Sequence, residues 1–247
     1  MKHSISFLKI LFLRSVLYQN CMTDNENDCI YSDFQIVGTI KSNTGTCGSG
    51  SKNVFMGPFG LQTLVTYHIP YLIPNKLVDL SLGIWKFDSW DHEVLEIRIN
   101  NDLMGKLEAE THDYPNLCGI ENWGDHLYPF SFQYYLTDTH FTLTLKDFLD
   151  QGIADESWGF RDFVLKISPQ CVNFYSECNY SGEFFQICKG DKTTRSTNLP
   201  YEIKSIMMDY GIIVKIKDPD QFGGALQEFS SSQPCIGAYK FPKYIPQ

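Results

Sequence analysis

Short runs in which hydrophobic and polar residues alternate recur along this chain of 247 residues. Between positions 94 and 99, the residues Leu95, Ile97 and Ile99 share one face of an extended chain. An alternation with a period of two is typical of a half-buried β-strand. Runs of this kind predict strands at 34–40, 61–69, 77–87, 94–99, 130–136, 140–145 and 160–167.

Helical patterns are missing from the sequence by comparison. No segment combines a hydrophobic period near 3.6 residues with helix end caps. At most, 147–153 could form one short helical turn. Aromatic residues make up 15% of the chain, which favours pleated surfaces. Many short strands separated by glycine and proline predict an all-β protein whose first module is a β-sandwich.

Two features divide the chain. The first 22 residues resemble a signal peptide or leader, with Lys2 before a short apolar core. Lys9 and Arg14 interrupt that core and no clear cleavage site follows it, so a buried strand or a signal anchor remains an alternative. Near 168–171 a proline ends one pattern and a new one begins. We therefore expect a leader at 1–22, a sandwich domain at 23–170 and a second domain at 171–247.

Eight cysteines are spread along the chain without a close pair. Structural zinc sites usually contain such a pair, so disulfides in a secreted protein are the expected use, and buried free thiols are the alternative. Eight cysteines allow 105 complete pairings, and the connectivity stays open. The sequence 179–181 is an N-glycosylation sequon at Asn179, which has meaning only in a secreted chain.

The segment 174–185 carries a family resemblance. Phe174 or Tyr175 precedes a tight hairpin, and Tyr180 and Gly182 follow in an aromatic-x-Gly arrangement. This pattern resembles the opening of a βγ-crystallin Greek key motif, in which the glycine takes a positive φ. Ser205 stands where that family closes the motif with a serine, and a degenerate second copy follows at 214–224. The resemblance implies a crystallin-like Greek key domain at 171–247.

Proteins of that family often bind calcium through oxygen ligands in a short loop. The matching positions here hold Pro200, Tyr201, Lys204 and Ser205, of which the serine alone agrees with the family's pattern. Calcium needs six to eight oxygen ligands. We therefore expect no calcium site of that type in the first crystallin-like motif.

Two related motifs frame the first domain, at 87–93 (Phe-Asp-Ser-Trp-Asp-His-Glu) and at 155–163 (Asp-Glu-Ser-Trp-Gly-Phe-Arg-Asp-Phe). With Cys118, Gly119 and Asp125 between them, they resemble a module of ciliate secreted and surface proteins. That resemblance implies a jelly-roll-like sandwich, and crystallin domains also occur in secretory-granule proteins of ciliates. It implies no particular chemistry.

The two motifs place carboxylates beside tryptophans, which permits three interpretations. The carboxylates could form a calcium site, because calcium prefers hard oxygen ligands. Trp90 or Trp158 could stack on a sugar while the carboxylates bind its hydroxyls. The motifs could also be a structural corner, with acidic side chains capping turns and tryptophans filling the core. The candidate calcium ligands are Asp88, Asp91, Glu93 and Glu156.

Charge and motifs exclude several classes of function. The net charge of −9 leaves no basic patch for nucleic acid. No histidine pairs as in a metalloenzyme, and no nucleophile elbow or phosphate loop occurs. A glycosidase built on Glu93 and Glu156 is the remaining enzyme hypothesis. No apolar run long enough to span a membrane follows the leader.

The sequence thus predicts a non-enzymatic structural or adhesion protein that is secreted, stored in a secretory granule or held at the cell surface. A lectin-like, carbohydrate-binding protein assisted by calcium is the alternative, and a subunit of a larger assembly is the third possibility. Its expected partners are other proteins or extracellular glycans.

Overall fold

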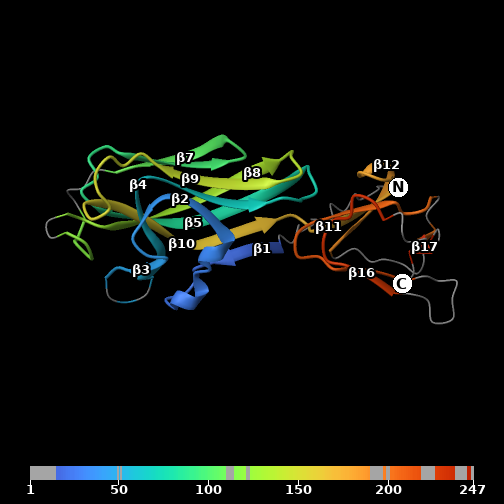
Figure 1. Ribbon diagram of the computed structural model, residues 1–247, viewed down its shortest axis with the longest axis horizontal. Helices are drawn as coiled ribbons and strands as arrows, with labels where there is room; N and C mark the ends of the chain where they lie inside the picture. The colour runs from blue at the N-terminus through green and yellow to red at the C-terminus, as the bar shows by residue number, and fades with distance from the viewer. Residues whose placement is uncertain are drawn as a thin grey trace, which may run out of the picture.

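The computed structural model describes residues 15–48, 50, 52–109, 114–120, 123–189, 197–198, 201–217, 226–236 and 244–245. Within them nearly all regular structure is β-strand, and the helical turns are two short 3-10 turns at Glu26–Asp28 and Tyr31–Asp33. The all-β prediction is confirmed, and the stretch 147–153 contains no helix. Figure 1 shows strands β1 to β10 gathered in one part of an elongated molecule and the later strands in the other.

The first ten strands form one continuous antiparallel sheet. The predicted ranges 34–40 and 94–99 match β2 and β6, and the other predicted strands are found with longer or shifted ends. Alternation did not reveal β1, β3 and β7. The strands are β1 (Ser15–Asn20), β2 (Phe34–Ile40), β3 (Thr44–Thr46), β4 (Val54–Ile69), β5 (Lys76–Asp88), β6 (Val94–Ile99), β7 (Asp102–Glu108), β8 (His126–Leu136), β9 (Phe141–Asp147) and β10 (Glu156–Ile167).

Strand β4 links two layers of this sheet and makes it a sandwich. Its first half pairs with β3 and β10, and its second half pairs with β2 and β9. Between the halves, Leu61 and Gln62 have φ values of 52° and 63°, which bends the strand. The strand order is β7-β6-β9-β4-β10-β5-β8. The end strands approach each other where the Tyr134 hydroxyl donates to Asp102 at 3.0 Å, so the sandwich is nearly closed.

Aromatic and aliphatic side chains from both layers fill one core. Trp90, Trp158, Phe59, Phe160 and Phe163 are all fully buried in it. Large ring systems bury much apolar area each, which explains how short alternating strands stabilise a domain of this size. The high aromatic content seen in the sequence is therefore used mainly for packing.

The proposed leader overlaps this fold. Residues 1–14 lie outside the described residues, but Ser15–Asn20 forms β1 and pairs with the second half of β10. The Tyr18 ring stacks on Tyr67 with centroids 4.6 Å apart, and Cys21 is bonded to Cys29. A leader that ended at residue 22 would remove β1 and one cysteine from the domain. Residues 15–21 thus contact the sandwich, and a leader at 1–22 stays a prediction.

All eight cysteines form disulfides. Two lie in the sandwich, Cys21–Cys29 and Cys47–Cys118. Two lie in the C-terminal part, Cys171–Cys188 and Cys178–Cys235. The alternative of free thiols is wrong. Disulfides of this number are compatible with an oxidising, extracellular environment. None of the helices in the described part of the chain is long and apolar enough to cross a membrane.

The sheet and the core both change after β10. The next strand begins at Cys171, next to the expected boundary, and a separate apolar cluster forms between residues 172 and 236. Its strands pair as β12-β11-β14, β13-β17 and β15-β16. They are β11 (Cys171–Glu177), β12 (Ser181–Cys188), β13 (Thr197–Asn198), β14 (Ser205–Met208), β15 (Val214–Lys217), β16 (Leu226–Phe229) and β17 (Tyr244–Ile245).

The hairpin between β11 and β12 has the local geometry that the crystallin resemblance implies. Gly182 has a φ of +81°, and a Cβ there would lie 2.2 Å from the Ser176 hydroxyl. The buried Ser205 hydroxyl accepts the Tyr180 N–H at 3.0 Å and donates to the Glu177 carbonyl at 2.6 Å, which ties the hairpin to β14. Membership of that family remains a prediction. The glycines of its second copy, at 223 and 224, lie outside the described residues.

A buried ion pair joins the two parts of the molecule. The Lys76 ammonium of β5 contacts the Asp209 carboxylate, and it also donates to the Pro169 carbonyl at 2.6 Å. The same carboxylate accepts the N–H groups of Ile73 and Cys171 at 2.9 and 2.6 Å. Asp209 therefore satisfies donors from both sides of the boundary, which fixes the orientation of the second domain.

Candidate functional site

Three of the predicted calcium ligands converge at one corner of the sandwich. Oxygen atoms of Asp91, Glu93 and Glu156 all lie within 4.8 Å of one another. Asp91 and Glu93 belong to the turn between β5 and β6, and Glu156 is the first residue of β10. The turn is held by the Asp91 N–H, which donates to the Glu93 carboxylate. The pairing of β10 with β5 brings the two sequence motifs together.

Glu156 is the most unusual member of this acidic trio. Its side chain is 0% exposed, one carboxylate oxygen accepts the Gln151 N–H at 3.3 Å, and the other has no hydrogen-bond partner. Burial, opposed by the hydrogen bond from Gln151 and reinforced by the neighbouring carboxylates of Glu93, Asp150 and Asp91, raises the pKa of Glu156 to about 7. Burial also raises the pKa of Glu93. A buried oxygen without a partner is costly unless a proton or a cation occupies its vicinity.

The fourth predicted ligand, Asp88, points elsewhere. Its carboxylate accepts the Ile120 N–H and lies against Gly119, where an added Cβ would come within 2.2 Å of it. The structure therefore joins Asp91, Glu93 and Glu156 as one group and leaves Asp88 out of it. Three carboxylates can supply several of the six to eight oxygens that calcium takes, with waters completing the shell.

Neither tryptophan offers a surface for a sugar. Trp90 and Trp158 are both 0% exposed. Their indole N–H groups donate to the Ser157 carbonyl at 3.1 Å and to the Asp147 carboxylate at 2.6 Å. Buried tryptophans normally satisfy their N–H in this way. The idea that Trp90 or Trp158 stacks on a pyranose is therefore incompatible with their burial, and both serve the core.

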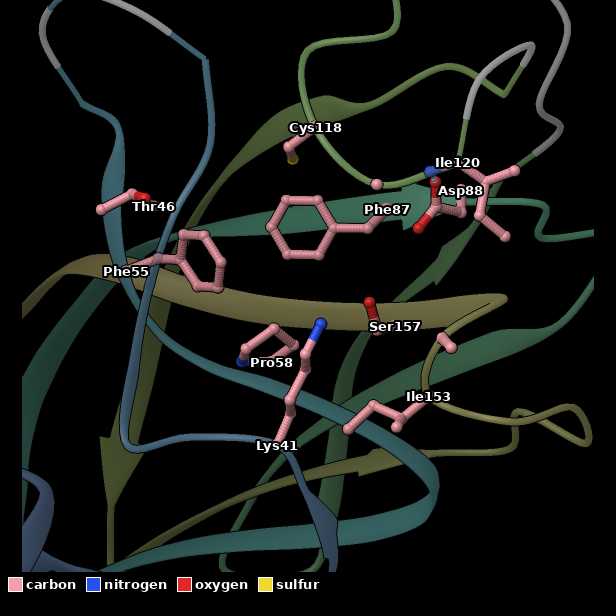
Figure 2. Close-up of a pocket in the computed structure, with 12 residues that line it drawn as sticks. Lys41, Thr46, Phe55, Pro58, Phe87, Asp88, Cys118, Ile120, Ile153 and Ser157 are labelled. Carbon is pink, nitrogen blue, oxygen red and sulfur yellow. Dashed lines mark hydrogen bonds between the residues drawn. The ribbon is translucent and has the colours of Figure 1, made fainter.

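Asp88 and Ser157, from the same two sequence motifs, line a pocket of about 290 Å³ (Figure 2). The rings of Phe55 and Phe87 line one side, and the Lys41 ammonium and the Ser157 hydroxyl point into the space between them and Asp88. Ser157 follows Glu156 in β10, so neighbouring residues of one strand serve the pocket and the acidic trio. The volume is close to the lower end of ligand sites, about 300 Å³, so the pocket suits a small polar group.

Buried polar groups hold the Asp88 side of this pocket. Burial, opposed by the hydrogen bond from Ile120 and reinforced by the nearby Asp125 carboxylate, raises the pKa of Asp88 to about 6. Asp125 accepts the N–H groups of Leu117 and Cys118, each at 2.8 Å, and so anchors the loop above the pocket. Lys86 donates to the Gly124 carbonyl at 2.8 Å, and burial lowers its pKa to about 8.

A second cluster of potential metal ligands contains a disulfide bond. Cys47, Cys118 and Asp125 also lie within 4.8 Å of one another. Because the two cysteines form a disulfide, they carry no thiolate that could bind a metal. This disulfide instead fixes the loop that carries Gly119 and Ile120 at the pocket.

The arrangement of Glu93 and Glu156 is poorly suited to hydrolysis. Their nearest oxygens lie within 4.8 Å of each other, which agrees with the roughly 5–5.5 Å between the carboxyl groups of retaining glycosidases. Glu156, however, is fully buried, so a substrate could not reach its carboxylate. The geometry favours a cation over a glycosidic bond at this position.

Two predicted features of the second domain are accessible. Asn179 lies exposed in the hairpin between β11 and β12, so its side chain can meet a glycosylating enzyme. At the positions compared with crystallin calcium ligands, Lys204 pairs with Glu202 at 2.7 Å, and Ser205 is used by the hairpin. Pro200 lies outside the described residues.

Sequence reasoning missed several pocket residues. Lys41 lies in a loop-like stretch without any pattern, and Phe55 belongs to the half of β4 that was not predicted. Cys118 and Gly119 were noted between the two motifs of the ciliate-like module. Their position there was the one sequence signal for the loop above the pocket.

Neither a protein-family model nor a curated protein matches this sequence. Among solved structures, a family 35 carbohydrate binding module from Clostridium thermocellum is similar over 55% of this chain and 92% of its own, at 6% identity and a TM-score of 0.33. The M60 catalytic domain with the CBM51-1 and CBM51-2 domains of Clostridium perfringens ZmpB is similar over 86% of this chain, at 9% identity and a TM-score of 0.30. This chain covers 23% of that second structure. Superpositions with such low TM-scores carry no argument about ligands.

Proposed function

We propose that this chain is an extracellular, non-enzymatic structural or adhesion protein whose first domain is completed by a calcium ion at Asp91, Glu93 and Glu156. The observation that carries the proposal is the fully buried Glu156 carboxylate, which has one oxygen without a hydrogen-bond partner and lies beside two further carboxylates. A calcium ion there offsets two of the three negative charges and joins the β5–β6 turn to the start of β10. Four disulfides support the same extracellular assignment.

Calcium titration of the full chain tests this function. We expect calorimetry to show one bound ion, and we expect a chelator to lower the melting temperature of the purified protein. A ligand present at 100 times its Kd stabilises the folded state by about 2.7 kcal/mol, equivalent to roughly 5–10 °C in a domain of this size. Identical melting curves with calcium and with chelator would refute the calcium site.

A second candidate function is saccharide binding in the pocket of about 290 Å³. Asp88, Lys41 and Ser157 provide an acceptor, a cation and a hydroxyl around the two phenylalanine rings. Such a mixture of polar groups over an apolar wall suits a sugar residue. A glycan array with the wild-type protein and the Lys41→Ala variant is the test. Binding that the variant retains would place the glycan elsewhere, and silence of the wild type across diverse glycans would remove the candidate.

The second domain fits a scaffold role in the same proposal. Its crystallin-like hairpin is fixed by Ser205 and by the disulfide between Cys178 and Cys235, which leaves the exposed Asn179 as a site for N-glycosylation. Intact-mass measurement of the secreted protein before and after glycosidase treatment tests this point. An unmodified Asn179 in protein secreted from eukaryotic cells would contradict it.

A further inference from the structure

The outer face of the sheet formed by β10, β5 and β8 carries a row of small and polar residues. The inward side chains of β5 and β10, such as Leu80 and Leu165, are buried in the core. Their neighbours point outward, and the uninterrupted register places Ser81 opposite Ser131 and Asp79 opposite Gln133. This face therefore presents hydroxyl, amide and carboxylate groups across neighbouring strands.

The same face is hollow. Two adjoining cavities share Ser81 and Val164, one of about 500 Å³ and the other of about 240 Å³. Small residues form much of their lining, and at one end the Leu127 side chain packs over Gly83, where a Cβ would lie 2.9 Å from it. We call this hollow the sheet groove. From Pro129 to Gln133 it follows β8 for about 13 Å, at roughly 3.3 Å per residue.

Charges along the sheet groove are balanced. Lys52 pairs with Asp162 at 3.5 Å at one end. Towards the other end, Lys166 lies beside Asp79 across the β10–β5 pair, and the Gln133 amide donates to Asp79 at 3.1 Å. Two cations facing two carboxylates give no net attraction for a polyanion. The groove suits an uncharged, hydrogen-bonding ligand.

An exposed aromatic ring lies on the same face of β8, two residues beyond Gln133. Tyr135 shares the outward face of β8 with Ser131 and Gln133, and 57% of it is exposed. Its neighbour Tyr134 points inward and packs against the core. Exposed tyrosine combines an apolar ring face with a hydroxyl, which suits contact with one face of a sugar ring.

We propose that the sheet groove binds an extended, uncharged oligosaccharide chain, with Tyr135 as the stacking platform and Gln133, Ser131 and Ser81 as hydrogen-bonding partners. The proposal goes beyond the second candidate function, because its site is distinct from the Lys41 pocket. A peptide that adds a strand is a poorer occupant, because the groove lies on the face of the sheet, where the backbones of β5 and β10 are already paired. Nucleic acid is disfavoured by the balanced charges and the net charge of −9.

Affinity electrophoresis of the full chain in native gels tests the proposal. The gels contain neutral polysaccharides of several backbones (mixed-linkage glucan, xylan, galactomannan) or an anionic pectin for comparison. We expect at least one neutral polysaccharide to retard the protein. Ser131→Trp fills the groove and Tyr135→Ala removes the platform, and each should weaken retardation at least tenfold. Tyr71→Ala is the matched control, since Tyr71 is a similarly exposed tyrosine (53%) in the loop between β4 and β5.

The possible results separate the two saccharide sites. Loss of binding in the Ser131 and Tyr135 variants, with Tyr71→Ala and Lys41→Ala unchanged, supports the sheet groove. Loss in Lys41→Ala alone overturns the groove and leaves saccharide binding at the pocket. Retardation by pectin alone, or by no polysaccharide, overturns the groove as well. Melting curves of each variant confirm that it is folded, and the calcium titration is independent of all these outcomes.

Discussion

Replacing Glu156 by glutamine should change how the stability of the calcium-free protein depends on pH. Glu156 is fully buried, and its pKa is raised to about 7 from the 4.5 of an exposed glutamate. The folded protein therefore holds a proton that the unfolded chain has released. Because the folded state binds more protons in this range, its stability falls as the pH rises from about 4.5 to about 7.

The size of the effect follows from the two pKa values. At about 1.36 kcal/mol per pKa unit, the difference between 4.5 and about 7 corresponds to about 3 kcal/mol. Above pH 7 in chelator, the wild type has lost that amount relative to pH 4.5, and the Glu156→Gln variant has not. Calcium should restore the wild type at pH 7.5, because the ion takes the place of the proton, and it should leave the variant unchanged.

Chemical denaturation at several pH values, with chelator and with calcium, measures both effects. The informative quantity is the slope of the unfolding free energy against pH, because the amide can also change that free energy by an amount that does not depend on pH. Glu108→Gln serves as control, because Glu108 lies exposed at the end of β7, and its variant should follow the wild type. If wild type and Glu156→Gln have parallel pH profiles in chelator, the reasoning about the buried carboxylate is refuted.

Three further variants test the framework around the sites. Cys47→Ser removes the disulfide between two cysteines that are 71 residues apart in the sequence. By the chain-entropy relation, urea denaturation should show a free energy of unfolding that is lower by about 4 kcal/mol. A decrease below about 1 kcal/mol would contradict this expectation. Lys76→Met leaves the buried Asp209 without its cation and should lower the free energy of unfolding by about 3–5 kcal/mol. An unchanged free energy of unfolding would show that the ion pair does not hold the domains together. Gly119→Ala should lower the stability by about 1–3 kcal/mol, because the φ of Gly119 is +84° and the new Cβ would meet the aspartate carboxylate of the pocket. Gly152→Ala is the control and should have little effect, because the space around its Cβ is open. Equal melting temperatures for the two variants would refute the steric argument.

Much of the fold was accessible from local pattern. Strands such as β6 were predicted to their ends, because one of their faces is buried and the other is not. β1 was missed because its hydrophobic residues read as part of a leader, and β7 because its side chains are mostly exposed and alternate weakly. The hairpin at Gly182 was predicted with its positive φ, since glycine alone adopts that conformation without strain.

The candidate site was predicted in part. The sequence named the right carboxylates for the acidic trio, but it could not separate Asp88 from them, because Asp88 is held by a loop more than thirty residues away. It also could not tell whether Trp90 and Trp158 face solvent, since tryptophan beside carboxylates occurs both in binding sites and in cores. Their burial depends on how the two layers pack.

The sequence by itself determined the class of the protein: alternation requires strands, eight cysteines favour disulfides in an oxidising environment, and a negative charge excludes nucleic acid. The tertiary structure alone decided which side chains meet. The register between β5 and β10 places the turn that holds Asp91 and Glu93 against Glu156, and the packing of the two layers buries both tryptophans. Contacts between strands distant in sequence depend on pairing and packing, and local pattern carries no information about them.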